Sequence, residues 1–301
     1  MTDLQKQTID TLTAEMTEIL VFGKRAEHTI VTYKTYAVPF MEYCFDELDK
    51  HPKLATEKDV RSFLNTIQVD RELGDRTINN AISSIHFLFE AVLDLKWNKY
   101  KVPFRTFDEF IPFVPTKEEV ETFISSVQDL KRKAMFVIMY ATGMRVCEVC
   151  HLHYGDILRS KKRIHVSPSK RRKERYVELP DKCFEVIMEY CRALPARVKA
   201  SLTSDSWLFP KQTLSADPIY TDYILRYISS IEDLLGWEHR FTSHTFRRAF
   251  ATHNFLDGNM TMEEIQAALG HAYISTTKIY VRQWVSALQD CHRNSIEGMA
   301  L

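Results

Sequence analysis

The chain has 301 residues, of which 45% are hydrophobic and 27% charged, values typical of a globular protein of about two domains. Its 40 Lys and Arg residues balance 40 Asp and Glu residues. The net charge therefore gives no indication of a nucleic-acid partner, and any basic surface has to be local. The six cysteines lack the spacing of a disulfide framework, the N-terminus lacks a signal peptide's apolar region, and the apolar run 134–144 is too short to span a bilayer. We therefore expect a cytoplasmic protein with no membrane contact.

Residues 1–97 carry helical periodicity. Thr56 and Asp75 are predicted helix starts, and Pro39 is expected to kink or end a helix that begins near Thr29. Four apolar residues that step by four, three and four positions share one helical face: Ile78, Ile82, Ile85 and Phe89.

The stretch 99–115, "KYKVPFRTFDEFIPFVP", breaks this pattern with three prolines and predicts an extended linker. Thr116 and Glu119 then form a capping box that opens a new helix. We expect three parts along the chain: a helical domain at 1–103, a linker at 104–115, and a second domain at 116–301 that ends in a tail helix.

Within the second domain the period changes at 162–180, where "RIHVS" and "RYVEL" alternate like two strands around a basic turn. Residues 159–175 hold nine Lys and Arg residues against Glu174 alone. The expected fold is mainly α with a small antiparallel β-sheet.

The stretch "TSHTFRRAFATHNF" (242–255) places two histidines and two arginines in an apolar helical pattern. Thr242 or Ser243 would cap the helix, which puts His244 and Arg247 on one face near its N-terminus, where an anion is favoured. An ordinary solvated face is the alternative interpretation of this helix taken alone.

Two further stretches carry similar signals. In "YATGMRVCEV" (140–149) a turn at Gly143 projects Arg145 from the start of a helix. In "ALGHAYISTTKIYV" (268–281) a helix ends at Gly270 and His271 lies in the turn. Ser275 caps the next helix, about a turn and a half before Tyr280. Taken singly, these residues are equally explained as surface, capping or packed side chains.

Together, "ATGMR", "SKRRKERYVEL", "HTFRRAFATHNF", "LGH" and "STTKIYV" resemble, in order and spacing, the motifs of the tyrosine recombinases, or phage-type integrases. The resemblance is close over about residues 113–290. Residues 1–100 resemble the family only in length and helical character. The resemblance to this family implies a helical, SAM-like core-binding domain followed by an α+β catalytic domain.

The resemblance also implies a site-specific DNA recombinase that cuts and rejoins strands through a 3′-phosphotyrosyl link at Tyr280, without ATP, metal or cofactor. Arginine suits a phosphate because its planar, permanently charged fork matches the phosphate oxygens, so Arg145 and Arg247 are the expected clamp. A phenol with a pKa near 10 needs help to lose its proton, and His244 is the expected acceptor.

Three more residues take supporting roles by resemblance. Lys170 is the expected acid for the leaving oxygen, although "SKRR" replaces the family's glycine-flanked turn and leaves Lys173 as a rival. His271 would donate a hydrogen bond to the phosphate, and Glu148 would hold the Arg145 region in place.

The implied partner is double-stranded DNA with an inverted-repeat recombination site, held by a homotetramer on two duplexes or together with a partner recombinase. The free protein could be a monomer, and the tail 283–301 could dock on its own subunit or on a neighbour. Candidate DNA contacts, besides base-reading residues that the sequence does not identify, are Arg171, Arg172, Lys173, Arg175, Arg248 and Lys278.

Two other functions remain open: a catalytically silent DNA-binding accessory protein with the same fold, and a DNA-relaxing enzyme without site preference. "CEVCHLH" (147–153) contains a C-x-x-C-H pattern. We interpret it as ordinary helix residues and not as a haem or metal site, because it follows Arg145 directly and no second ligand pair stands nearby.

Overall fold

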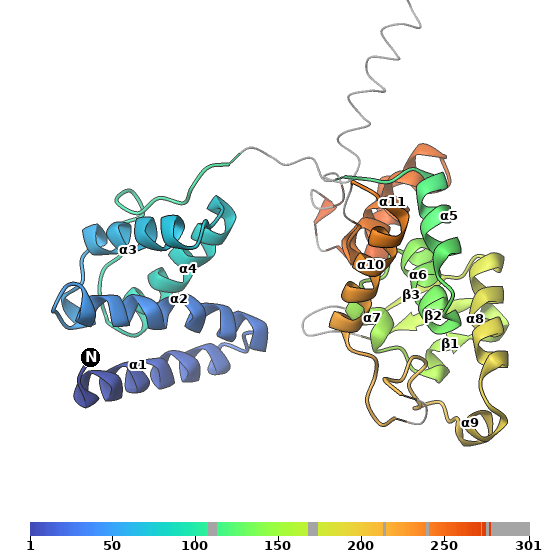
Figure 1. The fold of residues 1–301 in the computed structure, drawn as a ribbon, viewed down its shortest axis with the longest axis horizontal. Coiled ribbons are helices and arrows are strands. Elements are labelled where there is room, and N and C mark those ends of the chain that lie inside the picture. Colours follow the sequence, from blue (N-terminus) through green and yellow to red (C-terminus); the bar gives the residue numbers. More distant parts are fainter. Residues whose placement is uncertain are drawn as a thin grey trace, which may run out of the picture. The chain divides into compact units, whose positions relative to one another are not determined.

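The computed structural model describes residues 1–107, 113–167, 174–212, 215–238 and 241–271, together with 273, 274 and 277. The chain forms two compact units, Met1–Phe110 and Ile111–Leu301 (Figure 1). The predicted mainly α fold with a small antiparallel sheet is confirmed.

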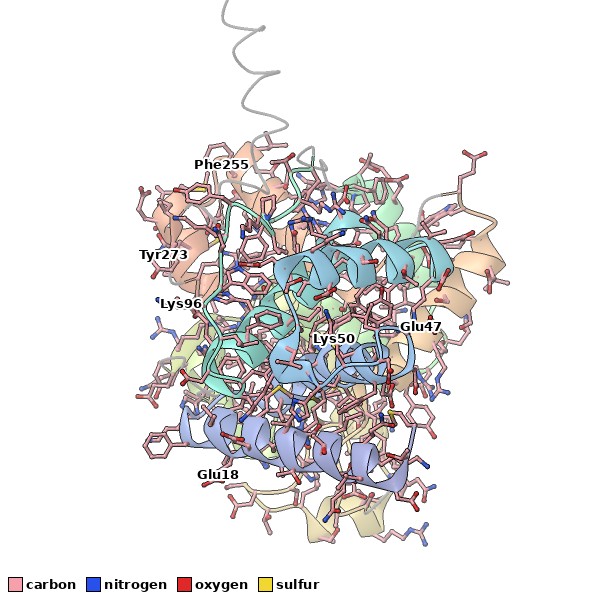
Figure 2. All side chains as sticks on the ribbon, turned by 90° about the vertical axis from the view of Figure 1, so that its left-hand side faces the viewer. Glu18, Glu47, Lys50, Lys96, Phe255 and Tyr273 are labelled. Carbon is pink, nitrogen blue, oxygen red and sulfur yellow. The ribbon has the colours of Figure 1, made fainter. Side chains whose placement is uncertain are left out.

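The first unit is helical, as predicted. Its elements are α1 (Asp3–Phe22), α2 (Glu27–Asp46), the 3-10 helix η1 (Pro52–Leu54), α3 (Glu57–Asp70) and α4 (Asp75–Ala91). The predicted starts at Thr56, which is the N-cap of α3, and at Asp75 are both confirmed. Lys50, labelled in Figure 2, lies in the turn after α2. It pairs with Asp59 in the first turn of α3 (Nζ–Oδ2 2.5 Å).

The predicted apolar face of α4 is confirmed, because all four of its residues are at most 2% exposed and pack in the core of this unit. The expected end of a helix at Pro39 is wrong, since α2 continues through it to Asp46. Proline removes one backbone hydrogen bond. The neighbouring Phe40 and Met41 are fully buried, and their burial outweighs that loss.

The second unit is larger and contains the sheet. Its helices are α5 (Lys117–Ser126), α6 (Leu130–Thr142), α7 (Val146–Cys150), η2 (Tyr154–Asp156), η3 (Arg159–Lys161), α8 (Asp181–Ala193), α9 (Ala196–Ser201), α10 (Thr221–Leu235), α11 (Ser243–Leu256) and α12 (Met262–Leu269). Its strands are β1 (Ile157–Leu158), β2 (Arg163–Val166) and β3 (Arg175–Glu178).

The strands pair antiparallel in the order β1-β2-β3, and Val166 lies opposite Arg175 at the base of the predicted hairpin. Alternate residues Ile164, Val166 and Val177 are buried, as a half-buried sheet requires. The sequence did not indicate β1, because two residues carry no readable alternation.

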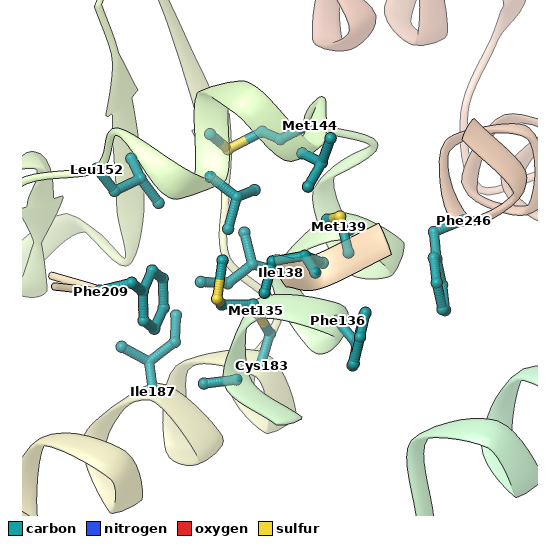
Figure 3. Close-up of a cluster of buried hydrophobic side chains, with 14 of the residues drawn as sticks. Met135, Phe136, Ile138, Met139, Met144, Leu152, Cys183, Ile187, Phe209 and Phe246 are labelled. Atoms are coloured by element: carbon teal, nitrogen blue, oxygen red, sulfur yellow. The ribbon is translucent and has the colours of Figure 1, made fainter. Parts of the chain in front are cut away.

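The core of the second unit surrounds α6, which packs against α8 and α11 (Figure 3). Phe246 of α11 stacks on Phe136 of α6, with ring centroids 5.4 Å apart, and is fully buried. Because Phe246 fixes α11 in the core, it also fixes the direction of its neighbour Arg247.

Candidate active site

Arg145 is presented by a tight turn between two helices. The helix α6 ends at Thr142, Gly143 adopts the left-handed conformation (φ +64°), and Arg145 is the N-cap of α7. A Cβ atom at Gly143 would lie 2.5 Å from Phe250 Cδ1 and 2.6 Å from Leu269 Cδ2. Glycine is therefore required here both by the backbone angle and by the close approach of two other elements.

Arg247 lies on α11 and is only 1% exposed. Its Nη1 donates to the carbonyl oxygen of Gly143 (2.7 Å), and its Nη2 donates to the carbonyl oxygen of Leu269 (2.6 Å). One guanidinium thus joins the turn after α6 to the end of α12. A buried guanidinium stays charged, and these hydrogen bonds to carbonyl oxygens offset the free-energy cost of removing it from water.

The C-terminal end of α12 gathers three arginines. The last carbonyls of a helix have no partner within the helix, and the helix dipole gives this end negative character. Leu269 O accepts from Arg247 and also from Arg145 Nη1 (3.5 Å), while Ala268 O accepts from Arg175 Nε (2.9 Å). Arg145 and Arg247, separated by 101 intervening residues, therefore converge on one carbonyl oxygen.

His271 completes this cluster. It lies just after Gly270, the left-handed C-cap of α12 (φ +64°), as the sequence predicted. Its Nε2 lies 2.8 Å from Arg247 Nη2, and its Nδ1 lies 2.9 Å from Thr277 Oγ1. Because a guanidinium can only donate, Nε2 is the acceptor and the proton of the neutral ring is on Nδ1, directed at Thr277. Donation of a hydrogen bond from His271 to a phosphate stays a prediction.

Glu148 is held between two arginines and is 5% exposed. Its Oε1 accepts from Arg145 Nη1 (3.1 Å), and its Oε2 accepts from the Arg145 backbone N–H (2.9 Å). Arg175 donates to both oxygens, at 3.1 and 2.8 Å. Burial acts to raise the pKa of Glu148, but the hydrogen bonds and charge of Arg175, with a smaller part from Arg145, lower it to about 2.

His244 lies three residues before Arg247 on α11, and only part of its side chain is exposed. Partial burial, and after it the positive charges of Arg247, Arg248 and Arg145, lower the pKa of His244 below its usual value. The imidazole is therefore neutral near pH 7 and able to accept a proton.

The remaining predicted residues comprise Arg248, which the structure describes, and six residues that it does not. Arg248, on α11, donates from Nη2 to Thr245 Oγ1 (2.9 Å) and is partly exposed. Six predicted site residues lie outside the described residues: Lys170, Arg171, Arg172, Lys173, Lys278 and Tyr280. The predicted helix cap at Ser275 and the expected tail 283–301 also lie outside the described residues.

Arg175 was predicted among the DNA contacts, but its side chain is 12% exposed and its guanidinium faces Glu148 and Ala268. The sequence did contain a signal for this inward position. Arg175 lies two residues before the buried Val177 on β3, and residues two apart on a strand point to the same face of the sheet. The basic neighbours of Arg175 hid that signal.

The C-x-x-C-H stretch is part of α7 and the residue that follows it. His151 Nδ1 lies 2.7 Å from the carbonyl oxygen of Cys147, and burial raises the pKa of Cys150 to about 12. Such a thiol is a poor metal ligand, because ligation needs the thiolate. Across the described part of the chain, no helix is long and apolar enough to cross a membrane.

Both units match known protein families. Residues 114–285 match the phage integrase family, and residues 12–99 match the N-terminal SAM-like domain of phage integrases. Among curated proteins, the integrase/recombinase y4qK of Sinorhizobium fredii is 31% identical over 234 residues, which cover 77% of this chain and 73% of that protein. Tyrosine recombinase XerC of Halalkalibacterium halodurans is 26% identical over 88% of this chain and 90% of its own.

Solved structures show the same fold. XerH recombinase bound to palindromic difH DNA in a post-cleavage complex has a TM-score of 0.69 at 20% identity, covering 87% of this chain and 78% of its own. The Tn1549 transposon integrase in complex with transposon right-end DNA has a TM-score of 0.69 at 18% identity, covering 94% and 98%. With the family match spanning more than half of its residues, the chain belongs to the phage integrase family of tyrosine recombinases.

Proposed function

We propose that the protein cuts and rejoins DNA strands at specific sites through a covalent 3′-phosphotyrosyl link at Tyr280. The observation that carries this proposal is the meeting of Arg145 and Arg247 on the Leu269 carbonyl, with His271 beside them. A phosphodiester carries its charge on two non-bridging oxygens, and attack on phosphorus increases that charge. Two fixed guanidinium groups are suited to stabilise it.

The position of Tyr280 in the sequence supports its role as the nucleophile. Thr277, whose side chain is fully buried against His271, is three residues before it. In the proposed reaction the phenol passes its proton to His244, and the phenolate oxygen attacks phosphorus.

The bond from phosphorus to the 5′-oxygen then breaks, and that oxygen takes a proton from Lys170, with Lys173 as the rival. Rejoining reverses these steps with a 5′-hydroxyl from another strand. One phosphodiester is exchanged for one phosphotyrosyl ester, so the sequence of steps needs neither ATP nor a metal. The proposed substrate is duplex DNA with inverted repeats around a short spacer, and the proposed assembly is a homotetramer on two duplexes.

The test is a duplex that carries candidate inverted repeats from DNA beside the gene and a nick near the cleavage point. Cleavage releases a short fragment, so the covalent adduct accumulates. The wild-type protein should form an adduct that Tyr280→Phe does not form. Binding without an adduct from either protein would identify an accessory protein. Equal relaxation of plasmids with and without the repeats would identify a relaxing enzyme.

A further inference from the structure

We infer that Arg175 is a positioning residue of the cleavage reaction: it fixes Glu148, and through Glu148 it fixes the guanidinium of Arg145 that receives the phosphate. This inference rests on the proposed function of the same site. It assigns to Arg175 a role in the rate of cleavage and none in contact with DNA.

The first observation is that Arg175 makes a two-pronged ion pair away from solvent. Its Nη1 and Nη2 donate to the two carboxylate oxygens of Glu148, at 3.1 and 2.8 Å, and the side chains are 12% and 5% exposed. Paired, parallel hydrogen bonds of this kind fix the orientation of both groups as well as their separation. Glu148 therefore cannot rotate without breaking two charged bonds.

The second observation is that the same carboxylate orients Arg145. Glu148 Oε1 accepts from Arg145 Nη1, and Oε2 accepts from the Arg145 backbone N–H. Each oxygen of Glu148 thus receives one bond from Arg175 and one from Arg145. A rotation of the carboxylate toward either arginine moves it away from the other, so the position of Arg175 is transmitted to Arg145.

The third observation is that Arg175 also supports the turn that carries His271. Its Nε donates to Ala268 O, and its guanidinium packs on Gly270, where an added Cβ would lie 3.3 Å from Arg175 Nη1. The next carbonyl, that of Leu269, is the oxygen on which Arg145 and Arg247 meet. All three nitrogen atoms of the Arg175 guanidinium, Nε, Nη1 and Nη2, therefore donate hydrogen bonds within the protein.

The place of Arg175 in the sheet adds a link to the predicted general acid. Arg175 opens β3 and pairs with Val166, the last residue of β2, and Lys170 lies between these two residues in the sequence. Arg163, farther along the same hairpin, pairs with Glu178 on the exposed side of the sheet (2.6 Å). Arg163 is therefore a matched control, an ion-paired arginine of the same sheet that does not face the site.

The experiment compares full-length wild type, Arg175→Lys, Arg175→Gln and Arg163→Gln on the nicked duplex, with DNA affinity and adduct formation measured separately. Lysine keeps the charge but lacks the planar fork. Displacement of a catalytic group by about 1 Å costs about 100-fold in rate. Both Arg175 variants should therefore form adduct about 100-fold more slowly, while their DNA affinity stays within about twofold of wild type and Arg163→Gln behaves as wild type.

A second readout separates positioning from loss of folding. Without Arg175, buried Glu148 keeps Arg145 as a partner, and its pKa rises from about 2 toward the range of the assay. Arg175→Gln should therefore lose cleavage as the pH falls through that raised pKa. The double variant Glu148→Gln/Arg175→Gln should lack this additional acid limb, because its residue 148 does not titrate.

Three results would overturn the inference. Wild-type cleavage by Arg175→Lys would show that the fork is not needed, and that variant decides the matter if Arg175→Gln does not fold. Weakened DNA affinity with normal cleavage of the bound duplex would make Arg175 a DNA contact. An unchanged NMR signal of the Arg145 guanidinium in Arg175→Lys, measured without DNA, would refute the positioning directly. That signal decides the inference even if the wild-type protein forms no adduct, a result that would refute only the proposed function.

Discussion

Replacement of Gly143 by alanine should damage both the stability of the second unit and the geometry of its site. Gly143 has φ +64°, where an L-residue costs about 1–2 kcal/mol, partly offset by about 0.4–1 kcal/mol from a less flexible unfolded chain. The new Cβ would also lie 2.5 Å from Phe250 and 2.6 Å from Leu269. Such overpacking costs about 1–3 kcal/mol, so the expected total loss is about 2–4 kcal/mol.

Gly236 provides the control for this prediction. It has nearly the same backbone angle (φ +63°), but among the described residues no neighbouring atom lies within 4 Å of the added Cβ. Gly236→Ala should therefore cost only about 1 kcal/mol, which is the strain of the backbone less the gain in the unfolded chain. The difference between the two variants measures the close approach of Phe250 and Leu269 at Gly143.

Urea denaturation of the full chain, with amide hydrogen exchange in α6 and α11 to identify the transition of the second unit, measures both free energies of unfolding. Gly143→Ala should also slow adduct formation, because its carbonyl and that of Leu269 hold Arg247. Equal stability and equal cleavage in the two variants would refute the claim that this turn sets the position of the arginines.

Three further outcomes follow from the same structure. The pKa of Glu148 is about 2 in the folded protein, below its usual value of 4.5. Its ionised form therefore contributes about 3 kcal/mol of stability above pH 4.5, and this contribution is lost as the pH falls toward 2. Glu148→Gln should flatten the dependence of the free energy of unfolding on pH in that interval. His244 has a lowered pKa, so adduct formation should persist below pH 6.5 and fall only at the lower pH where His244 gains a proton, and His244→Gln should be slow at every pH without this acid limb. Phe123 is fully buried and meets the rings of Phe136, Phe241 and Phe246, so Phe123→Ala should cost about 3–5 kcal/mol in urea denaturation, and a cost under 1 kcal/mol would contradict its place in the core.

The local signals in the sequence were read correctly because they are complete within a few residues. The predicted capping box of Thr116 with Glu119 is present in the structure. The turns at Gly143 and Gly270 are also present and left-handed. Each of these has a signal in side chains and backbone groups within one helical turn, so the sequence alone is enough to predict it.

The contacts that the sequence did not reveal are those made between distant elements. Two carbonyl groups at the end of α12, those of Ala268 and Leu269, bind three arginines from three other elements. Backbone carbonyls have no sequence signature, so only the fold reveals which charged side chains they accept. The partners of Arg175, Glu148 and Ala268, likewise lie far away in the chain, so the sequence predicts a DNA contact there and does not reveal these bonds.

The most direct test of the account is whether Arg145 and Arg247 act on the charge of one phosphate. A nicked duplex with a neutral methylphosphonate in place of the cleaved phosphate removes that charge. On the ordinary phosphate, Arg145→Ala and Arg247→Ala should each lower adduct formation by about 100- to 1,000-fold. On the methylphosphonate, both variants should approach the wild-type rate. A defect that remains unchanged for either arginine would contradict the shared clamp.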